Sequence, residues 1–215
     1  MFMCGRYALF NTQGLQSQFE LDFADPMPER YNIAPQQIAP VIKEVGGRRV
    51  LMHAIWGLRP SWANDAMPKP FNAKVETVAE KPFFRNAWQR SRVIVPADGY
   101  YEWKTTASGK RPYFIYPESG LFGFAGLLEF HEEVPNFTII TTAANALTQE
   151  IHDRMPVILQ PADYAAWLSA GNNSNKLLLR QIAGQYPSEK MRLQMAHKAV
   201  GNVSNEGAFL LGGNK

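Results

Sequence analysis

Short hydrophobic segments separated by turn-forming residues set the pattern of this chain. Many of these segments are rich in β-branched and aromatic residues, and Gly, Pro, Asn or Ser closes each of them. This pattern predicts strands rather than long helices. The expected strands are 40–44, 49–58, 93–96, 100–104, 113–116, 122–130, 137–142 and 157–159. Residues 105–110 are expected to form a loose hairpin turn.

A few segments instead have the spacing of short amphipathic helices. Thr12 is a candidate N-cap for a helix that runs toward Phe19, with Leu15 and Phe19 on one face. Further helices are expected at 82–90, 144–150, 162–168 and 175–183. Residues 30–35 are expected to form an extended loop, because a Pro-rich segment precedes them and a proline ends them.

The order of these elements favours an α+β fold. We expect a single domain over residues 1–215, built on a mostly antiparallel, barrel-like β-sheet with flanking short helices. Strands and helices do not alternate regularly, which argues against a doubly wound parallel sheet. The chain has neither repeats nor low-complexity tracts, and its length suits one domain with a substantial core.

Composition places the chain among ordinary soluble proteins. Hydrophobic residues make up 46% of it and charged residues 19%. No apolar run approaches the ~18 residues of a membrane span, and the start of the chain lacks the features of a secretory signal. A single cysteine excludes an internal disulfide. We therefore expect a cytoplasmic protein that does not enter a membrane.

Positive charge gathers in the middle of the chain. The net charge is +3, but residues 59–111 carry ten Lys or Arg and five acids, so this segment has +5 and the remainder −2. Aromatic residues are interleaved with these charges. Cations neutralise phosphates and aromatic rings stack on unpaired bases, which suggests single-stranded nucleic acid as a partner. The alternative is that the charges cover the surface while the aromatic rings form the core.

Several common kinds of catalytic and cofactor site are excluded. The sequence has no GxGxxG fingerprint, no phosphate-binding loop and no GxSxG nucleophile elbow. Its four histidines are scattered and lack zinc-ligand spacing. We expect neither a metal nor a cofactor.

Cys4 is the only cysteine, and a second methionine, Met3, stands directly before it. If Cys4 becomes the N-terminal residue, its α-amine and thiol form a 1,2-aminothiol. Such a group condenses with an aldehyde through an imine that the sulfur closes to a thiazolidine. The amine titrates near ~8 and the thiol near ~8.5, so both reactive forms exist near neutral pH. The alternative is that Cys4 is an inert hydrophobic residue.

Three other residues have suitable chemistry for the same reaction. Glu102 lies between aromatic residues, a setting that raises a carboxyl pKa and favours proton transfer. His152 can exchange protons at neutral pH, and Asp153 or Arg154 can hold its segment in place. Asn72 can orient an amine or a phosphate oxygen through its amide. Taken singly, each has a structural alternative: a solvent-exposed or Lys104-paired glutamate, a structural histidine and a turn residue.

Seven segments in order resemble the SRAP family, the SOS-response-associated abasic-site processing proteins, over nearly the whole chain. They are CGRY at 4–7, RYNIAP at 30–35, WGLRPSW at 56–62, NAKVET at 72–77, YEWK at 101–104, HDRMP at 152–156 and VGNV at 200–203. The resemblance implies a compact, mostly antiparallel β-structure with flanking helices. It also implies a partner: single-stranded DNA that contains abasic sites.

The resemblance implies a covalent mechanism and a role for each site residue. Cys4 is the nucleophile that forms a thiazolidine with the ring-opened abasic aldehyde, and a self-processing peptidase activity exposes its amine. Asn72 positions the N-terminus, while Glu102 and His152 transfer protons. The expected DNA contacts are Arg6, Asn32, Trp62, Lys74, Trp103, Arg154 and His197. We expect a monomer, since nothing in the sequence suggests a coiled coil.

The sequence departs from the family pattern at two places. The family cysteine normally follows the initiating methionine directly, whereas Phe2 and Met3 intervene here. Either Met3 is the start or residues 1–3 are removed as a leader. Lys74 stands where the family often has arginine, which keeps the charge but loses bidentate phosphate geometry.

Two other functions fit the residues alone. One is an N-terminal cysteine amidohydrolase or peptidase without a DNA role. The other is a non-covalent single-stranded DNA binder in which Cys4 has no part.

Overall fold

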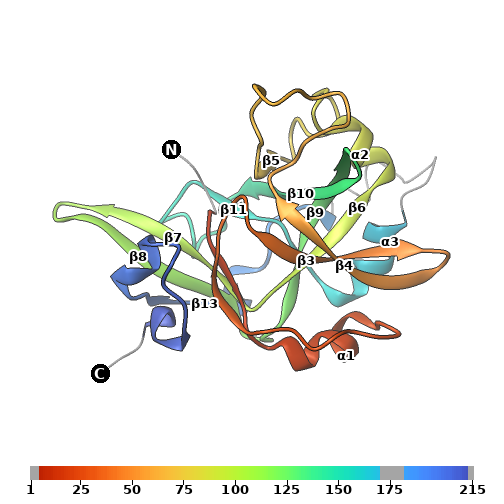
Figure 1. Cartoon of the computed structure of the whole chain (residues 1–215). Helices are drawn as coiled ribbons and strands as arrows, with labels where there is room; N and C mark the ends of the chain where they lie inside the picture. The colour runs from red at the N-terminus through yellow and green to blue at the C-terminus, as the bar shows by residue number, and fades with distance from the viewer. Residues whose placement is uncertain (1–4, 170–181, 213–215) are drawn as a thin grey trace.

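The fold is known from a computed structural model that describes residues 5–169 and 182–212. Two sheets make up most of it (Figure 1). The first sheet has the order β13-β8-β7-β1-β2. Its strands are β1 (Tyr7–Leu9), β2 (Arg30–Ile33), β7 (Gly99–Thr106), β8 (Gly109–Pro117) and β13 (Met191–Met195). All pairings in this sheet are antiparallel.

The second sheet has the order β11-β10-β4-β3-β6-β9-β12, and β5 also pairs with β10. Its first strands are β3 (Ile38–Val45), β4 (Arg48–Trp56), β5 (Asn72–Lys74) and β6 (Arg92–Ala97). The later ones are β9 (Phe122–His131), β10 (Val134–Ala143), β11 (Arg154–Pro156) and β12 (Ile158–Leu159). Because β10 also pairs with β9, five of these strands close into a ring. The closure is partial, since β3 meets β6 only at Ile42 and Ile94.

The α-helices are short and pack around the sheets (Figure 1). They are α1 (Leu15–Phe19), α2 (Arg85–Arg90) and α3 (Tyr164–Leu168). The 3-10 helices are η1 (Thr12–Gly14), η2 (Pro161–Asp163), η3 (Ser188–Lys190), η4 (Lys198–Gly201) and η5 (Ala208–Leu211). The expected α+β class with mostly antiparallel strands and few short helices is confirmed. No helix within residues 5–169 and 182–212 combines the length and apolarity that crossing a membrane requires.

Two hydrophobic clusters cover opposite faces of the first sheet. The main cluster includes Tyr7, Tyr100 and Ile115 and extends into the second sheet. The second cluster includes Tyr101 and Phe114, with side chains from the C-terminal segment. Adjacent residues such as Tyr100 and Tyr101 fall into different clusters because successive strand side chains point to opposite faces. The first sheet is therefore buried on both sides, and this determines which way each of its polar residues faces.

Arg92, a buried residue of β6, binds the C-terminal ends of α2 and α3. Arg92 donates from Nε to the carbonyl of Trp167 at 2.6 Å, from Nη1 to that of Trp88 at 3.1 Å and from Nη2 to that of Ser169 at 2.7 Å. Burial lowers the pKa of Arg92 to about 10, so the guanidinium stays charged at neutral pH. Its charge lies among carbonyls that end α2 and α3, where a cation is favoured.

All the strands expected from hydrophobic pattern are present, with shifted ends. The hairpin at 105–110 also forms, but its turn is tight because the β7–β8 pairing runs up to Thr106 and Gly109. The sequence pattern missed β1, β5, β11 and β13, and it assigned β2 to an extended loop. Three of the missed strands have three residues each. Such strands exist because partners pair with them, and their own sequence is too short to show a period.

The helix predictions were less accurate. Thr12 is not an N-cap: it begins a 3-10 turn, and α1 starts at Leu15. Residues 144–150 do not form a helix: 146–150 form a turn and 144–145 have no regular structure. There the side-chain oxygen of Asn145 accepts hydrogen bonds from the backbone N–H of Leu147 and Thr148, which competes with helical bonding.

The remaining helices are only partly as predicted. The helix at 82–90 forms only from Arg85, and the helix at 162–168 forms from Tyr164 after a 3-10 turn. The helix expected at 175–183 falls largely outside the described residues.

Candidate active site

One edge of the second sheet is formed by the C-terminal end of β10 and by the short strands β5 and β11 on its two sides. β5 pairs with β10 in parallel, placing Asn72 opposite Ile139 and Lys74 opposite Thr141. On the other side of β10, the antiparallel strand β11 places Pro156 opposite the same Thr141. β11 begins two residues after His152. The pairing therefore brings the segments that carry Asn72 and His152 to the two sides of one strand.

The segment after Cys4 leads to this edge. Cys4 itself lies outside the described residues, but Gly5 and Arg6 are described. A Cβ at Gly5 would lie 3.9 Å from Cε2 of Phe71, the residue before Asn72. The backbone N–H of Tyr101, the residue before Glu102, donates to the carbonyl of Arg6 at 2.9 Å. Residues one or two positions after Cys4 thus lie beside the residues that directly precede Asn72 and Glu102.

Glu102 is buried, with 4% of its surface exposed. It lies on β7 opposite Tyr113 of β8, and the alternation of the strand puts its side chain on the face of Tyr100, toward the main cluster. Nζ of Lys104 lies 3.6 Å from a carboxylate oxygen of Glu150. This ion pair links the strand of Glu102 to the turn that precedes His152.

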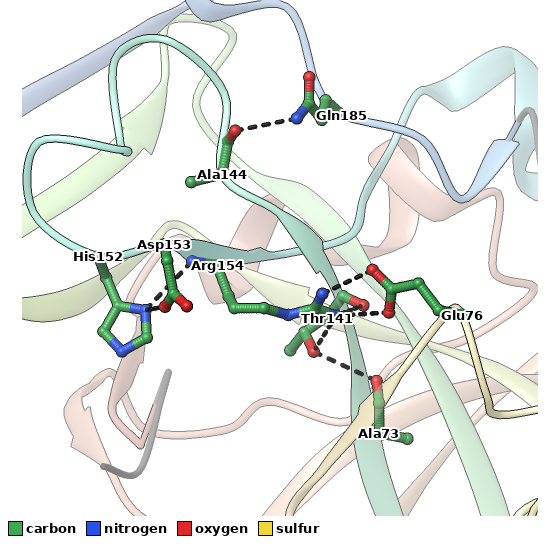
Figure 2. Close-up of polar contacts among 8 residues, drawn as sticks. All are labelled: Ala73, Glu76, Thr141, Ala144, His152, Asp153, Arg154 and Gln185. Atoms are coloured by element: carbon green, nitrogen blue, oxygen red, sulfur yellow. Dashed lines mark hydrogen bonds and ion pairs between the residues drawn. The ribbon is translucent and has the colours of Figure 1, made fainter.

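The imidazole of His152 is mostly buried and makes two contacts through one atom. Its Nδ1 lies 2.8 Å from Oδ1 of Asp153 and 3.1 Å from the backbone nitrogen of Arg154 (Figure 2). The N–H of Arg154 can donate only to an unprotonated Nδ1, whereas Asp153 accepts only from a protonated one. Burial lowers the pKa of His152, and the charge of Asp153 opposes this by raising it. A neutral ring that accepts from Arg154 carries its proton on Nε2, where it can be donated.

Asp153→Asn is expected to lower the pKa of His152 further. The substitution removes the negative charge that raises the pKa, while the burial that lowers it remains. The ring then stays neutral down to a lower pH than in the wild type. The midpoint of the His152 ring resonances in an NMR pH titration measures this shift. Asp22→Asn, in an exposed pair with Arg48, serves as the control; an unchanged or higher midpoint in Asp153→Asn would contradict the prediction.

Arg154 connects the three strand ends (Figure 2). Its Nη1 and Nη2 donate to the two carboxylate oxygens of Glu76 at 2.6 and 3.0 Å. Nη2 also donates to the carbonyl of Thr141 at 2.7 Å and contacts its hydroxyl at 3.2 Å. The hydroxyl of Thr141 in turn donates to the carbonyl of Ala73 at 3.3 Å. The network therefore runs from β11 across β10 to β5.

Comparison with known proteins now identifies the family. The sequence model of the SOS response associated peptidase (SRAP) family matches residues 3–203. The chain belongs to the SRAP family. It is 38% identical over 222 residues to the abasic site processing protein YoaM of Bacillus subtilis, covering 97% of each chain. It is 34% identical over 221 residues to the abasic site processing protein YedK of Escherichia coli, covering 97% of this chain and 99% of YedK.

A solved structure agrees on the fold. A crystal structure of a protein from Bacteroides thetaiotaomicron superposes with a TM-score of 0.85 and 23% identity. The match covers 97% of this chain and 99% of that one. The SRAP architecture described above is therefore also found in an experimentally determined chain.

Three of the DNA contacts expected for a SRAP protein lie on segments that lead to the site. Lys74 is exposed at the end of β5, two residues from Asn72. Trp62 is exposed and its ring lies edge-on to Phe83, with centroids 5.1 Å apart. Arg6 is half-buried, and burial lowers the pKa of its guanidinium, which donates to the carbonyl of Gly5.

Three other expected DNA contacts lie in or beside the C-terminal segment and the second cluster. Asn32 is fully buried, and its amide donates to the carbonyls of Asn202 and Asn205 at 2.9 and 3.0 Å. Trp103 packs against the second cluster, on the opposite face of β7 from Glu102. His197 is exposed, and its Nδ1 accepts from the backbone of Ala199 at the start of η4. Asn32 therefore holds the 202–205 loop of this SRAP fold. Its side chain is not exposed for the expected contact with DNA.

Sequence reasoning missed Glu76 and left Arg154 without its partner. It assigned no role to Glu76, it expected Asp153 or Arg154 to hold the segment of His152 in place, and it expected Arg154 to contact DNA. The only available signal was position, since Glu76 lies four residues after Asn72 and Asp153 directly follows His152. Their partners could not be identified without knowing that β5, β10 and β11 are neighbours.

Proposed function

We propose that this SRAP protein processes abasic sites in single-stranded DNA by covalent capture at Cys4. The observation that carries the proposal is that the residues after Cys4 lie beside those that precede Asn72 and Glu102. In addition, β10 pairs with both the strand of Asn72 and the strand that follows His152. The names of the relatives YoaM and YedK, abasic site processing proteins, support the choice of substrate.

The proposed reaction joins Cys4 to the open-chain aldehyde of the lesion. The neutral α-amine attacks the aldehyde carbon, and loss of one water leaves an imine. The sulfur then adds to the imine carbon, a proton passes to the nitrogen, and a thiazolidine results. No electrons are exchanged with an outside reagent, and water is the only product released.

The side chains of the site supply positioning and proton transfer. Asn72 orients the amine, while Glu102 and His152 move protons during ring opening, imine formation and reversal. Buried Glu102 is shielded from water, which favours proton exchange with the bound lesion over exchange with solvent. Lys74 and Arg6 provide positive charge for the phosphates, and exposed Trp62 provides a ring for stacking.

The amine of Cys4 must be free for this chemistry. With Met1 to Met3 attached, the nitrogen of Cys4 is an amide and cannot form an imine. We propose that hydrolysis of the bond between Met3 and Cys4, or initiation at Met3 followed by its removal, exposes the amine. The peptidase in the name of the family is consistent with self-processing at this bond.

The test uses single-stranded DNA with one abasic site and protein whose intact mass shows Cys4 at the terminus. We expect an adduct that survives heating in denaturing gels. Cys4→Ala should form none, and blocking thiols should have the same effect because Cys4 is the only cysteine. DNA carrying a tetrahydrofuran analogue, which has no aldehyde, is the matched substrate control.

Two results would count against the proposal. One is the absence of an adduct from protein with a confirmed Cys4 terminus. The other is an equal adduct yield from Cys4→Ala, which would mean that another residue is the nucleophile. An acyl intermediate on Cys4 with small amides, together with indifference to the lesion, would favour the amidohydrolase.

A further inference from the structure

We propose that Glu76 is a positioning residue of this site, acting through Arg154 to hold Asn72 and His152 at a fixed separation. The inference rests on the proposed function, in which both of these residues serve the captured lesion. The influence of Glu76 passes through the network that joins β5, β10 and β11 (Figure 2).

The ion pair between Glu76 and Arg154 is bidentate. Both carboxylate oxygens of Glu76 accept from the two terminal nitrogens of Arg154, at 2.6 and 3.0 Å. A bidentate pair fixes the plane of the guanidinium as well as its position. The Arg154 side chain is 12% exposed, so on its inner side it is held by Thr141 and on its outer side by Glu76. Loss of Glu76 would leave a mostly buried cation with only the contacts to Thr141.

The pair joins the segment after β5 to the start of β11. Glu76 follows the end of β5 by two residues, and Arg154 begins β11 directly after His152 and Asp153. β5 and β11 have three residues each and both pair with β10. Such short strands share few backbone hydrogen bonds, so a side-chain clamp across β10 adds a large part of their connection. The backbone nitrogen of Arg154 also contacts Nδ1 of His152, which couples the clamp to the ring.

The charge of the Glu76 carboxylate is stabilised by its neighbours. The hydrogen bond from Arg154 lowers the pKa of the Glu76 carboxyl, with the charges of Arg154 and Lys74 acting in the same direction. Glu76 is therefore an anion at neutral pH, and the clamp is in place under the conditions in which the amine of Cys4 reacts.

A role for Arg154 in phosphate binding predicts a different outcome. A phosphate could take a bidentate place on Arg154 only by displacing Glu76. In that case, removal of the Glu76 charge would free the cation, strengthen DNA binding and steepen its salt dependence. The clamp predicts unchanged binding and a slower reaction. The two roles can thus be separated by measuring rate and affinity on the same variant.

The experiment compares Glu76→Gln with Glu118→Gln. Glu118 is the matched control because its side chain is 50% exposed, against 49% for Glu76, and it also pairs with an arginine, Arg192. It lies in the turn after β8, outside the proposed site. Single-turnover adduct formation is measured at saturating abasic DNA, and equilibrium binding is measured with undamaged single-stranded DNA.

We expect Glu76→Gln to lower the adduct rate about tenfold or more, because small misplacements of reacting groups are costly. Binding of undamaged DNA should stay within about twofold, and Glu118→Gln should match the wild type in both measurements. Glu76→Asp, which keeps the charge, should recover part of the rate. Because Glu76 acts through Arg154, the double variant Glu76→Gln, Arg154→Gln should be no slower than Arg154→Gln alone.

Several results would overturn the inference. They are a wild-type rate in Glu76→Gln, tighter DNA binding with a steeper salt slope, or additive losses in the double variant. If Glu76→Gln does not fold, Thr141→Val removes the hydroxyl between Arg154 and Ala73 and must slow the reaction in the same way.

An NMR titration of His152 distinguishes this inference from the proposed function. If the wild type forms no adduct, the proposed function fails but the clamp can still be tested. Glu76→Gln should shift the His152 ring resonances and their midpoint, whereas Glu118→Gln should not. An unchanged titration would refute the clamp, and a normal wild-type adduct together with it would leave the proposed function standing.

Discussion

Replacing Glu102 by Gln is expected to slow adduct formation by about 10²-fold or more, the usual contribution of a positioned proton-transfer group. Glutamine keeps the size and much of the hydrogen bonding of the side chain, but it cannot exchange a proton. Glu102 is 4% exposed and lies on the face of β7 toward the main cluster. Water therefore has little access to the carboxyl group and is poorly placed to take the part of the side chain in proton transfer.

Single-turnover kinetics at saturating abasic DNA provide the measurement. Glu102→Asp keeps a carboxyl group on a side chain that is one methylene shorter. This variant should recover part of the rate, which a purely steric role would not predict. Thermal unfolding of each variant checks that the fold is intact. A rate for Glu102→Gln within threefold of the wild type would remove Glu102 from the mechanism.

Trp56→Ala is expected to destabilise the protein by about 3–5 kcal/mol, the usual cost of truncating a buried tryptophan. Trp56 is fully buried, and its ring contacts Tyr7, Phe71 and Phe137. Its Nε1 donates to the carbonyl of Phe71 at 2.8 Å. The side chain thus packs between the N-terminal strand, β10 and the residue before Asn72.

Trp56→Phe separates packing from hydrogen bonding. It keeps most of the buried ring and loses the indole N–H, so we expect a loss of only about 1 kcal/mol. The loss is small because the carbonyl of Phe71 also accepts from the backbone N–H of Ile139 at 3.1 Å. Urea unfolding of the two variants measures both values. Equal losses in the two, or a loss below about 1 kcal/mol in Trp56→Ala, would contradict this account.

Strands with their own hydrophobic pattern could be predicted from sequence, whereas the three-residue strands could not. The segments 93–96 and 137–142 are rich in β-branched residues and form β6 and β10 as expected. β5 and β11 have three residues each, and they are strands because β10 pairs with both. These two unpredicted strands are the ones that frame the candidate site.

Side-chain partners were equally hidden from sequence. The resemblance to the family implied that Arg154 contacts DNA; in the fold it is paired with Glu76, 78 positions away in sequence. The resemblance implied the same for Asn32, and in the fold its amide holds the 202–205 loop. A polar residue in a family motif can serve the fold or the substrate, and only the neighbours brought by folding distinguish the two.

The position of β1 has a practical consequence for work on this protein. Chain ends usually fray, but β1 lies inside the first sheet, between β7 and β2. Tyr7 is paired with Tyr100 on one side and Ile33 on the other, three residues after Cys4. Three residues span at most about 11 Å, so anything fused ahead of Cys4 is attached within that distance of Tyr7. Affinity tags and fluorescent labels therefore belong at the C-terminal end.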